Sequence, residues 1–233
     1  MFKVFKLKPI LIMVSTLLIS VLLSIGIVSV VQNDNIPKIT YTIVLDAGHG
    51  GRDAGCSGLD TDVKESDINL AIVKKLKSFL ENMGINVELT RHDQNGLYAS
   101  NVENYKLSDM SKRMDIIEKA SPEMVISIHQ NSYSDRAQRG AQAFYQEGDE
   151  SGKVFAEAIQ SELISQLENA REEANFGDYY ILDECKSNCV IVECGYLTNP
   201  DEEKLLSSDE YQDKVAYAIM CGVVRYFGLC GND

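Results

Sequence analysis

Apolar, strand-like runs alternate with amphipathic helical stretches over most of the chain, from residue 41 to residue 227. In the helical stretches, apolar residues recur every three or four positions, as expected when one face of a helix is buried. The pattern predicts strands at residues 41–46, 85–90, 124–129, 141–146 and 189–193, and helices at residues 66–83, 107–120, 152–167 and 210–227. Strands that alternate with helices favour a largely parallel sheet covered by helices on both faces. The predicted fold class is therefore α/β.

The first 38 residues differ from the rest of the chain. Lys3, Lys6 and Lys8 precede an uncharged apolar run from Ile10 to Val31, which is long enough to cross the hydrocarbon core of a bilayer. Because no small-x-small cleavage signal is apparent near its end, we predict an uncleaved membrane anchor with its lysines on the cytoplasmic side. A signal peptide that is removed after export is the alternative. Both readings place residues 39–233, one domain after a short tether, outside the cytoplasm.

The exported part is strongly acidic. The whole chain carries a formal net charge of −13, and all 35 acidic residues follow residue 31, whereas three of the 22 basic residues precede it. The exported part is therefore even more negative than the whole chain, which makes nucleic acid a poor partner. The six cysteines match no zinc-knuckle spacing. Export permits a disulfide, and Cys185 and Cys189 are the closest pair in sequence, but no pairing follows from the spacing.

Side chains suited to metal binding follow several of the predicted strands. His49, His92 and His129 are the only histidines, and each ends or closely follows a predicted strand, while Glu193 ends another. Because the carboxyl ends of parallel strands lie at one edge of a sheet, we expect these side chains to converge there. Imidazole nitrogen and carboxylate oxygen are typical ligands of zinc. The sequence therefore indicates a candidate zinc site at this edge.

The glycine-rich loop LDAGHGGRDAGCSG, Leu45 to Gly58, follows the first predicted strand. It lacks the third glycine of a dinucleotide-binding loop and the lysine of a Walker loop, and no helical pattern begins until Ser66. Glycines on both sides of His49 instead allow a sharp turn that brings the imidazole close to the sheet edge. A plain glycine turn with an incidental histidine is the alternative. We interpret the loop as one arm of the metal site.

A hydrolytic zinc site needs three protein ligands and one open position. His49 and His129 are two good candidates, and the third could be His92, Glu65 or Glu193, because spacing alone does not choose among them. Glu65 lies just before a predicted helix, where an acidic residue is favoured in any case. His92 is flanked by charged residues and is more typical of an exposed loop.

Glu193 ends a buried strand, where an unpaired carboxylate is costly. Pairing with an arginine or lysine would explain it, but its place at the same sheet edge favours a general base that accepts a proton from water beside the metal. Asp46 and Asn131 could orient the histidines or the substrate through hydrogen bonds. For Asp46, a carboxylate that caps the loop is an equally good interpretation.

Four segments together resemble the zinc-dependent N-acetylmuramoyl-L-alanine amidases of the third amidase family. They are LDAGHGGRDAG, KESDIN, VISIHQNS and VIVECGYLTN, in that family's order and at its usual separations. The resemblance implies His49, Glu65 and His129 as ligands of Zn²⁺ and Glu193 as the catalytic acid/base. It also implies a three-layer α/β domain over residues 39–233, with a mixed sheet of about six strands. The expected reaction is hydrolysis of the amide bond between N-acetylmuramic acid and L-alanine in peptidoglycan.

An anchor followed by a single catalytic domain is most similar to the sporulation- and germination-specific members of this family, which act in spore cortex maturation. Residues 168–178 are too few for the inhibitory helix of some members, so we expect an open cleft or control by a regulatory protein. Two other functions are alternatives. A zinc peptidase that cuts within the stem peptide would have a similar site. A non-catalytic anchored domain that binds the wall or a partner is disfavoured, because binding needs no open metal position.

Overall fold

The computed structural model describes residues 41–229, so the predicted anchor or signal segment at residues 1–38 lies outside the described residues. One sheet contains six strands in the order β2-β1-β3-β6-β4-β5. Their bounds are β1 Thr42–Ala47, β2 Asn86–Leu89, β3 Met124–Asn131, β4 Gln142–Tyr145, β5 Asn175–Phe176 and β6 Asn188–Tyr196. β1, β2, β3 and β6 run parallel, whereas β4 pairs antiparallel with β6 and parallel with β5. The predicted α/β class with a mostly parallel six-stranded sheet is confirmed.

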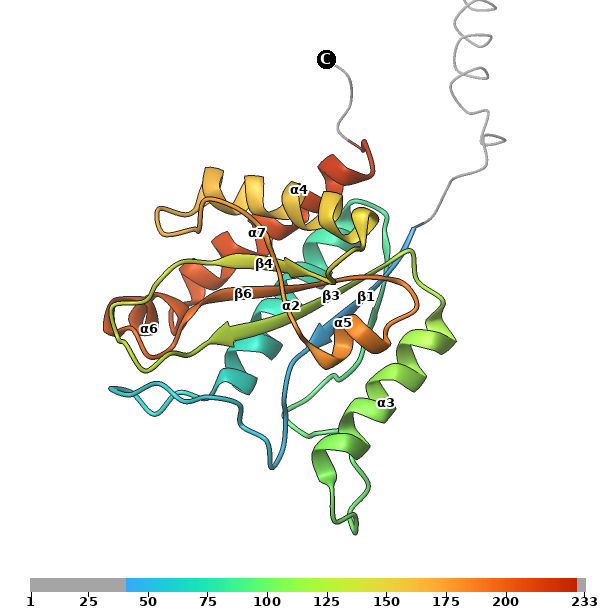
Figure 1. Ribbon diagram of the computed structural model, residues 1–233, viewed down its shortest axis with the longest axis horizontal. Coiled ribbons are helices and arrows are strands. Elements are labelled where there is room, and N and C mark those ends of the chain that lie inside the picture. The colour runs from blue at the N-terminus through green and yellow to red at the C-terminus, as the bar shows by residue number, and fades with distance from the viewer. Residues whose placement is uncertain (1–40, 230–233) are drawn as a thin grey trace, which may run out of the picture. The chain divides into compact units, whose positions relative to one another are not determined.

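Helices cover both faces of this sheet (Figure 1). Their bounds are α2 Glu65–Asn82, α3 Tyr105–Ala120, α4 Glu150–Gln166, α5 Tyr180–Glu184, α6 Pro200–Leu206 and α7 Asp209–Tyr226. On one face, α7 packs against both α2 and α4, while α3 and α5 contact each other and the sheet on the other. The three layers expected from the family resemblance are therefore present.

Alternate residues of each central strand enter two separate hydrophobic cores. On β1, Ile43 and Leu45 face the larger core beneath α2, α4 and α7, whereas Val44 faces the smaller core beneath α3 and α5. On β6, Val192 and Ile191 divide in the same way. Successive side chains of a strand point to opposite faces, so a strand buried on both faces is apolar throughout. This burial explains the continuous apolar runs in the sequence.

Three short elements, β5, α5 and α6, have no counterpart among the predicted elements. Their 2, 5 and 7 residues are too few to show a periodicity. α6 is specified locally instead, because the Asn199 side chain accepts hydrogen bonds from Asp201 N and Glu202 N, and Pro200 occupies the first turn. α2 begins at Glu65, one residue earlier than predicted.

Within residues 41–229, none of the helices is both long enough and apolar enough to span a bilayer.

Candidate active site

Three of the predicted site residues meet at the carboxyl edge of the sheet. His49 follows β1, His129 lies in β3, and Glu65 is the first residue of α2. Glu65 Oε1 lies 3.1 Å from His49 Nε2 and 2.9 Å from His129 Nδ1. One donor atom from each residue lies within 4.8 Å of the others, and within residues 41–229 this is the one such group of three or more metal-ligating side chains. Two nitrogens and one oxygen in this arrangement fit a zinc ion.

Of the three candidates for the third ligand, the structure brings Glu65 together with His49 and His129. His92 is exposed in a bend after β2 and is not part of the cluster. Glu193 stands directly beside His129, because the two residues are register partners on the neighbouring strands β3 and β6. It therefore borders the cluster without being one of its three members.

Glycines let the loop after β1 approach the cluster closely. A Cβ atom on Gly48 would lie 2.2 Å from His129 Cε1, and one on Gly55 would lie 2.4 Å from Glu65 Oε2. Both distances are far shorter than a van der Waals contact, so a side chain at either position would displace a member of the cluster. His49 itself has a positive φ of 61°, which is uncommon outside glycine and turns its imidazole toward the sheet edge. The glycine-rich loop is therefore shaped around the cluster.

Two buried arginines hold the backbone of this loop. Arg91 and Arg113 are each 1 % exposed. Arg91 donates hydrogen bonds from Nε to Ala47 O at 2.8 Å and from Nη2 to Gly48 O at 3.1 Å, and Arg113 Nη2 donates to His49 O at 2.6 Å. These bonds fix three successive carbonyl groups and hence the direction of the His49 side chain. Sequence reasoning missed both arginines.

Asp46 binds one of these arginines rather than a histidine. Its carboxylate accepts hydrogen bonds from Arg113 Nη1 at 2.5 Å, Thr90 Oγ1 at 2.6 Å and Ser127 Oγ at 2.6 Å. Burial alone would raise its pKa, but the Arg113 charge and the hydrogen bonds lower the pKa to about 2. Asp46 thus acts on the loop indirectly, through Arg113. Asn131 Oδ1 accepts from the adjacent Ser132 N.

Asp53 contacts His49 directly and was not singled out from the sequence. Its Oδ2 lies 2.9 Å from His49 Nδ1, while Lys106 Nζ lies 3.4 Å from its other oxygen. A histidine that binds a metal through one nitrogen usually donates its other N–H to a carboxylate. Asp53, four residues after the proposed ligand His49, could therefore have been predicted from the sequence as the carboxylate that orients this histidine.

Electrostatics favour positive charge between the three donors. Glu65 is only 3 % exposed and accepts hydrogen bonds from Cys56 N and Gln130 N at 2.9 and 3.1 Å. Burial would raise its pKa, yet the imidazoles of His129 and His49 hold it far below the usual range. Conversely, burial would lower the pKa of His49, but the hydrogen bonds and negative charges of Glu65 and Asp53 raise this pKa to about 9. A site that stabilises positive charge in this way meets the electrostatic condition for a bound cation.

Glu193 shows the opposite behaviour. It is 6 % exposed, and its Oε2 finds no hydrogen-bond partner in the part of the chain that the structure describes. Burial raises its pKa to about 7, with a further contribution from Glu65, although the imidazoles and a hydrogen bond from the Tyr179 hydroxyl lower it. A carboxyl group with a pKa near neutrality can both accept and release a proton during a reaction.

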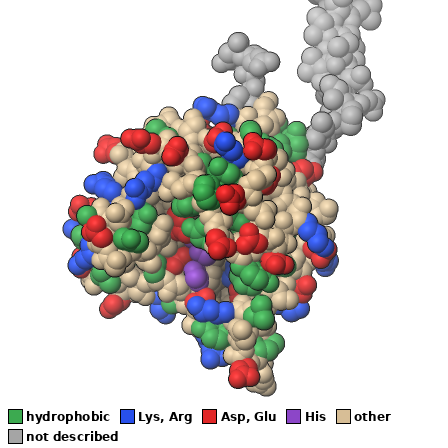
Figure 2. All heavy atoms as spheres, viewed as in Figure 1, with side chains coloured by type: hydrophobic (Ala, Val, Ile, Leu, Met, Phe, Trp, Pro, Cys, Tyr) green, Lys and Arg blue, Asp and Glu red, His purple; other side chains and the backbone are tan. Residues whose placement is uncertain are grey.

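A cavity of about 210 Å³ gives access to the imidazoles from the side of α3 and α5. Its lining includes His49, Asp53, Tyr105, Lys106, His129 and Ile181. Figure 2 shows histidine side chains at the bottom of a hollow with acidic side chains around it.

The site thus combines two imidazoles and a carboxylate with a neighbouring buried carboxyl group whose pKa is raised to about 7. This combination is typical of metal-dependent hydrolases. The model of the N-acetylmuramoyl-L-alanine amidase family matches residues 43–225. The chain therefore belongs to this family, and its substrate is peptidoglycan. Because peptidoglycan lies outside the cytoplasmic membrane, the enzyme acts in an extracytoplasmic compartment.

Individual relatives agree with this assignment. The germination-specific N-acetylmuramoyl-L-alanine amidase of Bacillus subtilis is 33% identical over 202 residues, which cover 85% of this chain and 84% of that protein. The structure of the CwlD amidase from Clostridioides difficile in complex with the GerS lipoprotein has a TM-score of 0.78 and 35% identity, and the match covers 82% of this chain and 100% of that one. The catalytic domain of CwlV from Bacillus (Paenibacillus) polymyxa has a TM-score of 0.71 and 28% identity, with 81% and 99% covered.

Proposed function

We propose that this amidase is zinc-dependent, with His49, Glu65 and His129 as the protein ligands and Glu193 as the catalytic acid/base. The observation that carries the proposal is the position of Glu65 Oε1 within 3.1 Å of both imidazoles, next to a buried Glu193 oxygen that has no hydrogen-bond partner within residues 41–229. The N, N, O donor set suits zinc and leaves a fourth position for water or substrate. When bound there, zinc lowers the pKa of water toward about 7 and polarises the carbonyl group of the scissile amide.

The protein side chains divide the remaining work. Asp53 holds His49 through Nδ1, so that Nε2 points toward Glu65. Glu193 accepts a proton from the attacking water and then gives it to the departing amine of L-alanine. A pKa of about 7 suits both steps, because neither transfer is then strongly uphill at neutral pH. Tyr179 keeps the carboxyl group in place through its hydroxyl hydrogen bond.

The finer biological role that we propose is in spore cortex maturation. The likeness to a germination-specific amidase over 85% of the chain supports it. We propose in addition that residues 10–31 anchor the enzyme to the membrane, because they form an uncharged apolar run behind three lysines. Binding of a regulatory protein is a further proposal, supported by the complex between the CwlD amidase and the GerS lipoprotein.

Mass spectrometry of peptidoglycan fragments tests the activity. The full chain, in detergent and loaded with zinc, is expected to release stem peptides that begin with L-alanine and to leave glycan strands with free lactyl groups. Cleavage inside the stem peptide, or no cleavage, would contradict the proposal. His92→Ala is the matched control, because this histidine is exposed and lies outside the cluster, and the variant is expected to cleave like the wild type.

The cortex role has its own test. Spores made with only the Glu193→Gln chain are expected to lack muramic lactam in their cortex, whereas spores made with His92→Ala contain it. A normal muramic lactam content in spores with Glu193→Gln would contradict the cortex role. It would not contradict the proposed amidase activity.

A further inference from the structure

We propose that Cys185 and Cys189 form a redox-active thiol pair, which closes into a disulfide that fastens the end of α5 to the start of β6. This pair lies outside the candidate active site, and the inference does not depend on the metal or on the role of Glu193. It rests on the positions of the two thiols, the cavities around them and the extracytoplasmic location.

The two cysteines are held together by the fold. Cys185 is the C-terminal cap of α5, and Cys189 is the second residue of β6, so only a three-residue turn separates them. Both pack in the smaller core with Ile181 and Leu182, and both line the same cavity. Cys185 and Cys189 are both free thiols. A disulfide here would therefore close a loop with only three residues between the two cysteines.

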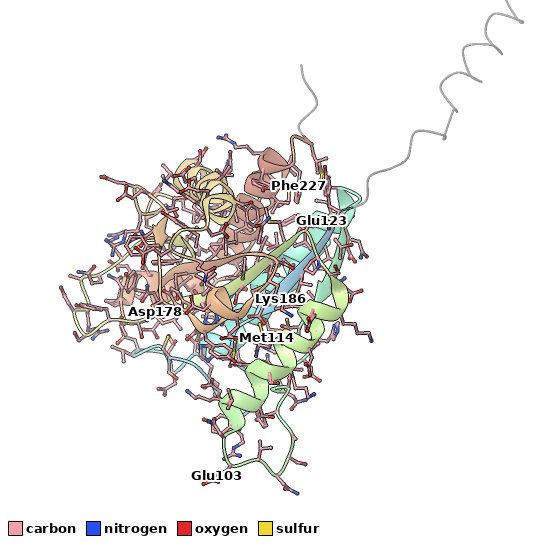
Figure 3. The ribbon with its side chains drawn as sticks, turned by 45° about the vertical axis from the view of Figure 1, so that its right-hand side comes forward. Glu103, Met114, Glu123, Asp178, Lys186 and Phe227 are labelled. Atoms are coloured by element: carbon pink, nitrogen blue, oxygen red, sulfur yellow. The ribbon has the colours of Figure 1, made fainter. Side chains whose placement is uncertain are left out.

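A small oxidant can reach this pair. A cavity of about 430 Å³ is lined by both cysteines, and a second cavity of about 300 Å³, between α3 and the turn, is lined by Cys185 but not by Cys189. Figure 3 labels Lys186 and Met114, which line this second cavity from the turn and from α3. Cys185 is half-buried, whereas Cys189 is almost fully buried. The two thiols thus differ as an attacking and a resolving cysteine should.

Their acidities differ in the same sense. The hydrogen bond from the Cys189 thiol lowers the pKa of Cys185, whereas the same contact and burial raise the pKa of Cys189. The thiolate is the nucleophile in exchange reactions, so Cys185 reacts first. Its sulfur attacks a low-molecular-weight disulfide and releases one thiol. Cys189 then loses its proton and attacks the Cys185 sulfur, which releases the second thiol. The protein thiols lose two electrons and two protons, and the disulfide gains them.

The location gives the bond a structural consequence. Extracytoplasmic compartments are those in which disulfides form and persist. Ile181 of α5 lines the active-site cavity, and Tyr179, which caps the same helix, donates a hydrogen bond to Glu193. A bond at Cys185 would therefore restrain the short helix that borders the site.

Tryptic mapping tests the bond directly, because trypsin cuts after Lys186, between the two cysteines. The full chain in detergent is reduced, incubated with oxidised glutathione, alkylated and digested. Peptides 172–186 and 187–204 are expected to remain joined, two hydrogens lighter than their sum. Since the second peptide also contains Cys194, fragment spectra must place the bond on Cys189.

Two variants make the result decisive. Cys189→Ala is expected to stop at a glutathione adduct on Cys185, and Cys221→Ala, a change on α7, is expected to form the bond like the wild type. Hydrogen exchange at residues 180–184 should slow in the oxidised wild type and not in Cys189→Ala. The inference is overturned if both thiols remain alkylated, if the wild type also stops at the glutathione adduct, or if oxidation leaves the exchange of α5 unchanged.

Discussion

Glu65 and Glu193 are chemically identical side chains in one site, both almost fully buried, and their surroundings shift their pKa values in opposite directions. Glu65 lies at the start of α2 and contacts two imidazoles and two backbone N–H groups, which hold its pKa far below the usual range. Glu193 lies near the end of β6 with one oxygen unpartnered among the described residues, and burial raises its pKa to about 7. The surroundings of Glu65 therefore keep its carboxylate charged, whereas those of Glu193 allow its carboxyl group to change charge near neutral pH.

On the roles proposed above, one sheet edge provides two functions from one residue type. A carboxylate surrounded by donors attracts a cation, whereas a desolvated carboxyl group transfers protons. Variants that change either carboxylate or the groups around it test this comparison.

Glu65→Gln is expected to abolish both metal binding and activity. The amide removes the negative charge between the imidazoles, and the loss of the metal removes several kcal/mol of transition-state stabilisation together with the source of the nucleophile. We expect at least about a 10⁴-fold fall in muropeptide cleavage, which corresponds to about 5.5 kcal/mol. Elemental analysis should find less than one tenth of the zinc of the wild type. Retention of zinc at the wild-type level would contradict the assigned role.

Glu193→Gln is expected to separate the two functions. Zinc content should equal that of the wild type, because Glu193 is not one of the three clustered donors. Cleavage should fall about 10²–10⁴-fold, the usual contribution of a general acid/base. Normal cleavage by a variant with a full complement of zinc would show that another group transfers the proton.

Asp46→Asn tests a third buried carboxylate, whose partner is a side chain rather than a metal. Removal of the carboxylate leaves Arg113 with one fewer charged partner in the interior, so the free energy of unfolding should fall by about 3 kcal/mol at pH 7. Because folding lowers the pKa of Asp46 to about 2, its carboxylate stabilises the fold above pH 3.8, and this contribution is lost as the pH falls toward 2.

Denaturant unfolding at several pH values measures this effect. The difference between the Asp46→Asn chain and the wild type should narrow between about pH 4 and pH 2. A difference that stays constant over this range would show that the charge of Asp46 does not stabilise the fold.

Gly48→Ala is expected to weaken metal binding while leaving all donor groups in place. The added Cβ would meet the His129 ring at 2.2 Å and turn the imidazole away, with about a 10–100-fold loss of zinc affinity in a competitive chelator titration. Gly148→Ala is the control, because a Cβ there meets nothing within 4 Å. Its positive φ of 83° costs about 1 kcal/mol of stability, but zinc affinity should not change.

Tyr179→Phe is expected to have the smallest effect. The hydroxyl hydrogen bond lowers the pKa of Glu193, so its removal should raise that pKa and move the acid limb of kcat/KM to higher pH by less than about one unit. Zinc content should not change. An acid limb that moves to lower pH, or stays in place, would show that Tyr179 does not control the protonation of Glu193.

The sequence was sufficient for the α/β class, the long helices and the convergence of His49, His129 and Glu193, because strands buried on both faces have a characteristic apolar pattern. Its patterns left the third ligand open, and family resemblance pointed to Glu65. The hold of Arg91 and Arg113 on the loop escaped sequence reasoning for a physical reason: the loop atoms that they bind are backbone carbonyls, which carry no sequence signal. α5 also escaped, since five residues show no period and its position comes from packing beneath β6.

Anomalous diffraction at the zinc edge, from crystals of the chain grown with zinc, can locate the metal itself. We expect one strong peak at about 2.0–2.2 Å from a nitrogen of His49, a nitrogen of His129 and an oxygen of Glu65, with Glu193 outside the coordination sphere. A peak elsewhere, or one at this place with Glu193 or Cys56 as a fourth protein ligand, would contradict it.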